Sequence, residues 1–149
     1  MKDNILQGVN VVAYEKDGKK YGMSCAWATH VDYDVILLLI GSQSNTGNNL
    51  KIGDRVGVSA LAKGQEDIAI HFGEKHSKSF NKFEKYELIN DEGAYLVPNS
   101  HTRMVCEVIN ILHPTNSPED NMIEVKILKS DGDDSLEFLS MADMHKLEK

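Results

Sequence analysis

The sequence has no apolar stretch long enough to cross a membrane. Its longest uninterrupted apolar run is Val35–Ile40, whereas a membrane-spanning helix needs about 20 apolar residues. The N-terminal residues Met1–Gln7 are polar and contain no apolar core of a secretory signal. We therefore expect a cytoplasmic protein without a membrane partner.

Cysteine and positive charge are also scarce. Cys25 and Cys106 are too few for a disulfide framework or a ligand cluster, and both lie in apolar runs that indicate small buried side chains. His71 and His76 do not share a helix face, so we expect no metal site. The net charge of −7 argues against nucleic acid as a partner, because phosphate backbones attract basic surfaces. A small anionic cofactor is still compatible with this charge, since amides and hydroxyls bind phosphate.

Most of the sequence consists of short apolar runs separated by turn residues. The 149 residues are 41% hydrophobic and 26% charged, which fits a single domain over residues 1–149. Asp17-Gly18 between two apolar runs predicts a type I′ hairpin, because both central residues of that turn need a positive φ. The expected strands are Val9–Tyr14, Tyr21–Thr29, Val35–Ile40, Arg55–Ala62, one near Tyr95, Met104–Leu112 and Met122–Leu128.

Helical signals are few and short. Asn45–Lys51 can form a helix behind a serine or asparagine cap. Gln65–Phe72 has acidic residues in its first turn and is followed by Gly73, which favours a helix that stops there. Leu136–Leu147 is compatible with a helix or with an irregular tail. The pattern predicts a mainly β fold with short helices, built as a small β-barrel with helical caps.

One stretch, Tyr21–Asn49, combines a bare strand face with a polar loop. From Gly22 to Ala28 every second residue is small, and such a face lets a flat ligand or another backbone approach closely. After the apolar strand, Ser42–Asn49 supplies hydroxyls and amides that can bind a phosphate. The same loop also fits an ordinary strand-to-helix connection, and Trp27 fits a packed aromatic residue as well as a ligand contact.

These features resemble the flavin reductase-like family, whose fold is the FMN-binding split barrel. The family pattern has a Gly-Val-x-Val-Val start, a charged turn with glycine, a Gly-Met-Thr/Ser segment, a buried strand, and a loop with Ser, Asn and Thr. Each motif is short, and their order and spacing carry the resemblance over most of the chain. The matching segments are Gly8–Val12, Asp17-Gly18, Gly22–Ser24, Val35–Ile40, Ser42–Thr46, His71–Gly73 with Asn81–Phe83, and Met104–Val108.

The resemblance implies an FMN-binding flavoprotein, with FAD as the other candidate flavin, that acts as an NAD(P)H-dependent flavin reductase. It also implies a homodimer with the flavin between subunits. The residues expected along the isoalloxazine and ribityl chain, through backbone amides and a serine hydroxyl, are Met23, Ser24, Cys25, Ala26 and Trp27. Those expected near the phosphate are Ser42, Ser44, Thr46 and Asn49, and Lys82 matches the lysine of the family's Asp-Lys-Phe segment.

Two departures from the family pattern bear on the electron donor. The family usually has Asp-Pro-Pro before the buried strand, whereas this chain reads Asp32-Tyr33-Asp34. A later strand of several reductases begins with a histidine associated with the nicotinamide, and Asn121 stands there in this chain. Asparagine cannot shuttle a proton as imidazole can. An alternative function is therefore an FMN-binding electron carrier that serves a protein acceptor without efficient NAD(P)H oxidation. A third is a split barrel that lost its flavin and binds another ligand or serves only as an interaction domain.

Overall fold

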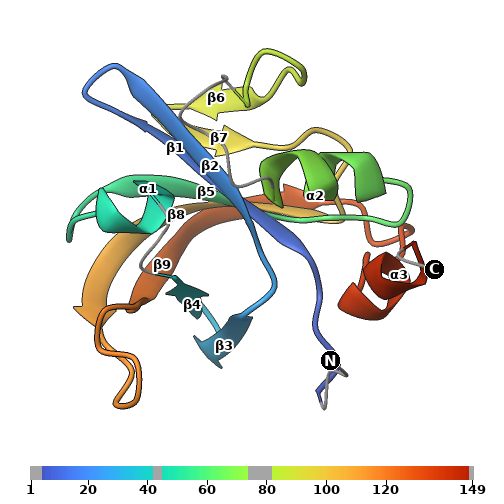
Figure 1. Cartoon of the computed structure of the whole chain (residues 1–149). Coiled ribbons are helices and arrows are strands. Elements are labelled where there is room, and N and C mark those ends of the chain that lie inside the picture. The colour runs from blue at the N-terminus through green and yellow to red at the C-terminus, as the bar shows by residue number, and fades with distance from the viewer. Residues whose placement is uncertain (1–4, 42–44, 74–81, 148–149) are drawn as a thin grey trace.

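The fold is one antiparallel β-sheet that curves without closing. The computed structural model describes residues 5–41, 45–73 and 82–147, and these contain nine strands and three helices (Figure 1). The strands pair in the order β3-β4-β9-β8-β5-β1-β7-β6, and β2 pairs with β1. The strands are β1 Asn10–Lys16, β2 Lys19–Cys25, β3 Ala28–Asp32, β4 Val35–Ile40, β5 Arg55–Ala60, β6 Ile89–Asp91, β7 Ala94–Leu96, β8 Thr102–Leu112 and β9 Asn121–Gly132. The helices are α1 Asn45–Asn48, α2 Glu66–Gly73 and α3 Met141–Lys146. The predicted mainly β split barrel with short helices is confirmed.

The turn between β1 and β2 forms as its sequence predicts. Asp17 and Gly18 have φ values of 52° and 78°, and Lys16 pairs with Lys19 across them. A second two-residue turn, Glu92-Gly93, has φ values of 51° and 97° and joins β6 to β7. This hairpin replaces the single strand expected near Tyr95.

The strand expected over Tyr21–Thr29 is two strands in the structure. β2 ends at Cys25, the chain crosses over at Ala26 and Trp27, and β3 begins at Ala28. β2 pairs with β1, whereas β3 pairs with β4. Periodicity could not show this break, because the small residues continue through it.

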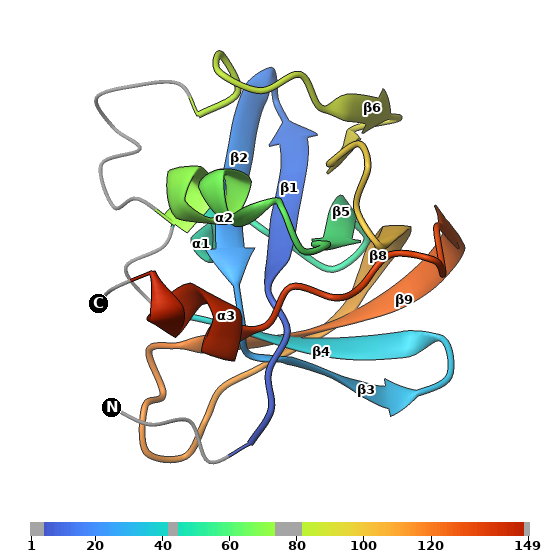
Figure 2. The ribbon, with the colours of Figure 1, turned by 90° about the vertical axis from the view of Figure 1, so that its right-hand side faces the viewer.

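β1 is buried on both faces and separates two hydrophobic cores. Val12 and Tyr14 point into the barrel, where β2, β4, β5, β8 and β9 contribute the other side chains. Val11 and Ala13 point to the other side and pack in the cluster that contains Phe72 of α2. Figure 2 shows α2 lying across β1 and β2. Full burial of each large apolar side chain stabilises the fold by about 1.5–3 kcal/mol.

The segment before α3 ties the C-terminal part of the chain to the sheet. The Leu139 carbonyl accepts from Val9 N at 3.1 Å, and Leu139 N donates to the Leu61 carbonyl at 2.9 Å. Ser140 caps α3 through a reciprocal pair of bonds with Asp143. The region that the sequence left between helix and tail is therefore a strand-like segment followed by a short helix.

Candidate functional site

The crossover between β2 and β3 exposes two backbone donors. In the part of the chain that the structure describes, the amide N–H groups of Ala26 and Trp27 have no hydrogen-bond acceptor. The Trp27 carbonyl accepts from Leu39 N at 2.9 Å, which fixes the crossover beside the end of β4. The indole of Trp27 is 55% exposed. A flat side chain next to two available amides fits a planar ligand with acceptor atoms on its edge.

Met23 and Cys25, also predicted to line the ring, face the barrel core. Cys25 is buried, and its thiol donates to the carbonyls of Trp27 and Leu39. Burial raises the pKa of Cys25 to about 11, because a thiolate is poorly solvated there. Met23 is partly buried against the same core. Cys25 therefore supports the crossover from beneath.

The bare face of β2 is occupied largely by protein. A Cβ at Gly22 would lie 3.0 Å from the Phe72 ring and 3.1 Å from the Phe83 ring. The Ser24 hydroxyl donates to the Ala69 carbonyl of α2 at 2.6 Å. Small residues here make room for α2 and two aromatic rings, and the hydroxyl hydrogen of Ser24 is already used. The part of the stretch left accessible to a ligand is its end, at Ala26 and Trp27.

The loop predicted to bind phosphate leads into α1, which lies against β2. Ser42 and Ser44 fall outside the described residues. Thr46 is 5% exposed, and its hydroxyl has no hydrogen-bond partner among the described residues. The Asn49 side chain donates to the Asn45 carbonyl at 2.7 Å. Thr46 thus keeps an unused hydroxyl, while Asn49 acts within its own turn.

Lys82 lies in a turn and contacts β2 through the Gly22 carbonyl. Its ammonium donates to the Phe72 carbonyl at 3.0 Å and to the Gly22 carbonyl at 3.3 Å, and the residue is 8% exposed. The His71 imidazole bonds the Lys82 carbonyl at 2.7 Å. The fold therefore brings residues 23–27, Thr46 and Lys82 together around β2. It places the Lys82 ammonium on backbone carbonyls.

Asn10 and Tyr14 lie near this site and were missed as site residues in the sequence, whereas Asn121 was considered only for the electron donor. The Asn10 side chain donates to the Cys25 carbonyl at 3.0 Å. The Tyr14 hydroxyl donates to the Thr46 carbonyl at 2.5 Å. Asn121 pairs with Ile40, and its amide donates to the Asn48 side chain at 3.1 Å. Tyr14 could have been noticed, because a tyrosine in an otherwise aliphatic buried strand needs a partner for its hydroxyl.

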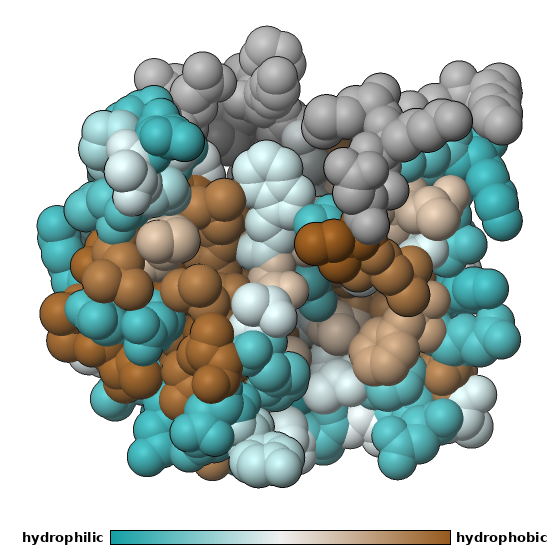
Figure 3. Space-filling view, turned by 90° about the horizontal axis from the view of Figure 1, so that it is seen from below, coloured by the Kyte–Doolittle hydropathy of each residue, from teal (hydrophilic) through white to brown (hydrophobic). Residues whose placement is uncertain are grey.

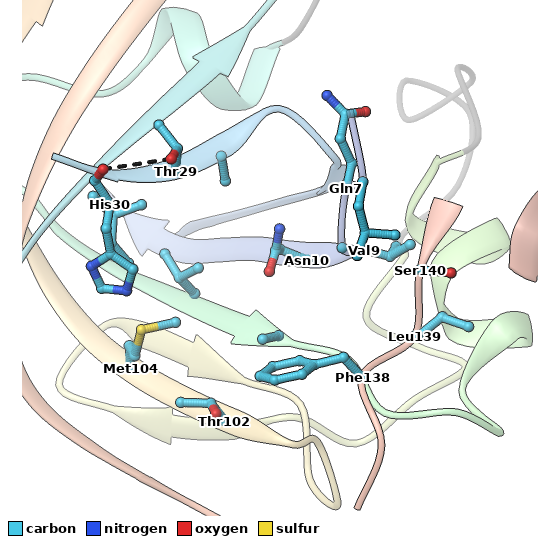
Figure 4. Close-up of a pocket in the computed structure, with 16 residues that line it drawn as sticks. Gln7, Val9, Asn10, Thr29, His30, Thr102, Met104, Phe138, Leu139 and Ser140 are labelled. Carbon is cyan, nitrogen blue, oxygen red and sulfur yellow. Dashed lines mark hydrogen bonds between the residues drawn. The ribbon is translucent and has the colours of Figure 1, made fainter. Parts of the chain in front are cut away.

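A pocket of about 460 Å³ opens on the other side of the crossover, between β3 and the segment before α3 (Figure 4). Its floor is apolar and includes Ile36, Val58 and Met104. Asn10 lies in its wall, and Phe138 projects over it in Figure 4. None of the predicted site residues lines this pocket. Asn10 connects the two regions through its bond to the Cys25 carbonyl.

The described part of the chain offers neither a metal-binding cluster nor a membrane-spanning helix. Residues 5–41, 45–73 and 82–147 contain no group of three or more His, Cys, Asp or Glu side chains placed to hold a metal ion. Among the same residues, no helix has the length and apolar character needed to traverse a bilayer.

Comparison with known proteins identifies the family of this chain. The family model described as flavin reductase like domain matches residues 1–137. The chain belongs to this family. The predicted family is thus confirmed, and the protein is a flavin reductase-type oxidoreductase. A search of curated proteins finds no match.

Solved structures share the fold at low sequence identity. An NADH:FAD oxidoreductase of Streptomyces globisporus C-1027 superposes with a TM-score of 0.81 at 20% identity, over 91% of this chain and 81% of that one. Flavoredoxin of Methanosarcina acetivorans gives 0.76 at 14% identity, over 90% and 74%. The styrene monooxygenase flavin reductase of Pseudomonas putida S12 gives 0.72 at 17% identity, over 86% and 82%.

Proposed function

We propose that this flavin reductase-family protein binds FMN with the ring edge at the β2–β3 crossover and the phosphate at the α1 turn, residues 45–49. The observation that carries the proposal is the pair of amides at Ala26 and Trp27 that have no acceptor among the described residues, beside an exposed indole and next to the strand that leads into α1. The unused Thr46 hydroxyl supports the phosphate end.

Each group has a defined task in this arrangement. A bound flavin supplies the capacity to accept a hydride and pass electrons onward. The amides of Ala26 and Trp27 donate to the ring's polar edge, which favours negative charge developing there. The Trp27 indole covers the ring and keeps water away from it. The Thr46 hydroxyl donates to the phosphate. These contacts serve the ring edge and the phosphate, both of which FMN contains, whereas FAD would also require a site for its adenosine.

The electron donor in this proposal is NADH or NADPH. Support comes from the family and from the Streptomyces globisporus oxidoreductase, a structure of which is a complex with NAD and FAD fragments. A specific observation favours the second candidate, an electron carrier for a protein acceptor. The Asn121 amide is engaged with Asn48 and has no titratable proton, so this position cannot assist proton transfer at a nicotinamide.

A homodimer is part of the proposal because exposed apolar side chains lie on and beside β3, a strand at the edge of the sheet. β3 is the last strand in the sheet order and offers an edge for pairing. Leu6 is 84% exposed and lines the pocket of Figure 4, whereas Val31 and Tyr33, 53% and 98% exposed, line a second hollow at the end of β3. Figure 3, viewed from below, shows apolar atoms gathered across this side. A second copy covering the face would bury them and close the pocket.

The dimer is tested by light scattering of Val31→Asp/Tyr33→Asp. The double variant should become monomeric at concentrations where the wild type is dimeric. Ile89→Asp, which changes an exposed apolar residue on β6, is the matched control and should stay dimeric. A wild-type protein that is monomeric, or a dimer unaffected by both charges, would rule this face out.

The function is tested in two steps by absorption spectroscopy. The purified protein should be yellow, or should take up added FMN more tightly than added FAD, and the flavin should bleach with NADH or NADPH in the absence of oxygen. Uptake without bleaching by either donor would leave the carrier function and remove the reductase. A colourless protein that binds neither flavin would refute both. Thr46→Val, which keeps the shape and removes the hydroxyl, should weaken FMN binding about tenfold or more.

A further inference from the structure

The α1 turn is too short to keep its shape by itself. A four-residue helix has not recovered the cost of its own nucleation, and this one contains Gly47. Two bonds lie beside the helix's own backbone bonds: Asn49 Nδ2 donates to the Asn45 carbonyl at 2.7 Å, and Leu50 N donates to the Gly47 carbonyl at 3.3 Å. Its conformation therefore depends on the strands around it.

Two side chains on one face of β1 hold the two ends of this turn. Tyr14 and Lys16 are two residues apart, so they point to the same side of the strand. The Tyr14 hydroxyl donates to the Thr46 carbonyl at 2.5 Å. The Lys16 ammonium donates to the Asn49 carbonyl at 3.0 Å and to the Asp54 carboxylate at 2.6 Å. Both strand residues thus act on backbone carbonyls of the turn.

The Tyr14 bond is well protected. Tyr14 is fully buried, and its ring stacks on Tyr21 with centroids 5.0 Å apart. Burial raises the pKa of Tyr14, so the hydroxyl stays a neutral donor at any physiological pH. The Thr46 carbonyl is one of the end carbonyls that a short helix leaves without an intrahelical partner. The buried Tyr14 hydroxyl therefore supplies the Thr46 carbonyl with its one hydrogen-bond donor among the described residues.

The opposite side of the turn has no room to move. A Cβ at Gly47 would lie 2.5 Å from the Ile40 Cγ2 atom, so the turn already touches the end of β4. Asn48 is held by the amide of Asn121 on β9 at 3.1 Å. β1 contacts the turn on one side, and β4 and β9 contact it on the other. These contacts together determine how the backbone and side chains of the turn are oriented.

We propose that Tyr14 and Lys16 are positioning residues for the flavin phosphate. By holding the carbonyls of Thr46 and Asn49, they aim the Thr46 hydroxyl at the phosphate and keep the turn in one conformation before the ligand arrives. Preorganisation of this kind raises affinity by removing an ordering cost. The inference rests on the proposed flavin site. It adds that β1, which has no contact role in the ring site, sets recognition of the phosphate.

The ratio of FMN to riboflavin affinity isolates this role, because the two ligands differ by the phosphate alone. In Tyr14→Phe the FMN affinity should fall about five- to tenfold, the effect of one lost hydrogen bond, while riboflavin affinity changes less than about twofold. A general loss of structure would weaken both ligands equally. Lys16→Met should lower the same ratio without disturbing the core, since the Lys16 side chain is partly exposed.

The matched control is Tyr21→Phe. It removes a hydroxyl from the other ring of the stacked pair, and this hydroxyl has no hydrogen bond among the described residues. Its FMN to riboflavin ratio should equal that of the wild type. A wild-type ratio in both Tyr14→Phe and Lys16→Met, with FMN still bound, would overturn the positioning role and leave the flavin site standing. A wild type that binds neither ligand would refute the proposed function, and the positioning role with it.

Discussion

Adding one methyl group at Gly47 tests whether the α1 turn is seated as tightly as the structure indicates. In Gly47→Ala the new Cβ would lie 2.5 Å from Ile40 Cγ2 and 3.0 Å from Ile40 Cβ. Ile40 is fully buried at the end of β4, and its branched side chain has little rotamer freedom. The turn must therefore move outward by a substantial part of an ångström, which carries Thr46 away from its place.

The expected magnitude follows from two opposing effects. Overpacking of a filled site costs about 1–3 kcal/mol, whereas alanine is favoured over glycine in a helix by about 1 kcal/mol. Overpacking is the larger effect, so the free energy of unfolding should fall by about 1 kcal/mol. FMN affinity should fall as well, because the phosphate contact is displaced. Urea denaturation and flavin fluorescence titration measure the two quantities.

Two further variants decide whether the contact with Ile40 is the cause. Gly41→Ala is the control, because among the described residues its Cβ would meet nothing closer than the Asp120 carboxylate at 3.9 Å, and it should be close to neutral. Ile40→Ala removes the clashing Cγ2 atom. Combined with Gly47→Ala, it should cost less than the sum of the two single changes, by about 1 kcal/mol. Additive effects, or a Gly47→Ala protein that matches Gly41→Ala in stability and FMN affinity, would refute the described seating of the turn.

Two other predictions concern titratable groups. Burial raises the pKa of Cys25 to about 11 and that of Cys106 to about 12, so a thiol reagent at about pH 8 should label neither cysteine until urea unfolds the chain; rapid labelling of the folded protein would contradict their burial. The backbone N–H and hydroxyl of Ser140 lower the pKa of Asp143, so the capping box stabilises the fold above the carboxyl's unfolded pKa and is lost as the pH falls through the lower folded value. The stability difference between wild type and Asp143→Asn should therefore shrink below about pH 4, and a difference that stays constant down to about pH 2 would exclude the cap.

The sequence predicted those strands and turns whose conformation depends on neighbouring residues in the chain. The apolar run Val35–Ile40 is β4 without adjustment, and Asp17-Gly18 forms the expected turn because its backbone demands are local. The prediction of one continuous strand over Tyr21–Thr29 was wrong. The chain breaks at Trp27 because β3 pairs with β4, and sequence periodicity does not show this pairing. The β6–β7 hairpin was missed because Glu92 at its turn is not a typical residue for a positive φ.

The sequence likewise predicted some features of the candidate site and missed others. Order and spacing of short motifs identified the family and pointed to the stretch from β2 to α1. They could not show that α2 and Phe83 fill the bare face at Gly22, since this depends on residues far apart in the chain. For the same reason they missed Tyr14, whose partner Thr46 lies across the fold. The predicted roles of Ser42 and Ser44 concern residues outside the described part of the chain and stay predictions.

A crystal structure of the protein grown with FMN tests the central claim most directly. The account predicts the polar edge of the ring within hydrogen-bonding distance of the Ala26 and Trp27 amides, and the phosphate at the Thr46 hydroxyl. Flavin bound instead in the pocket lined by Asn10, Met104 and Phe138, with the two amides still without an acceptor, would contradict it.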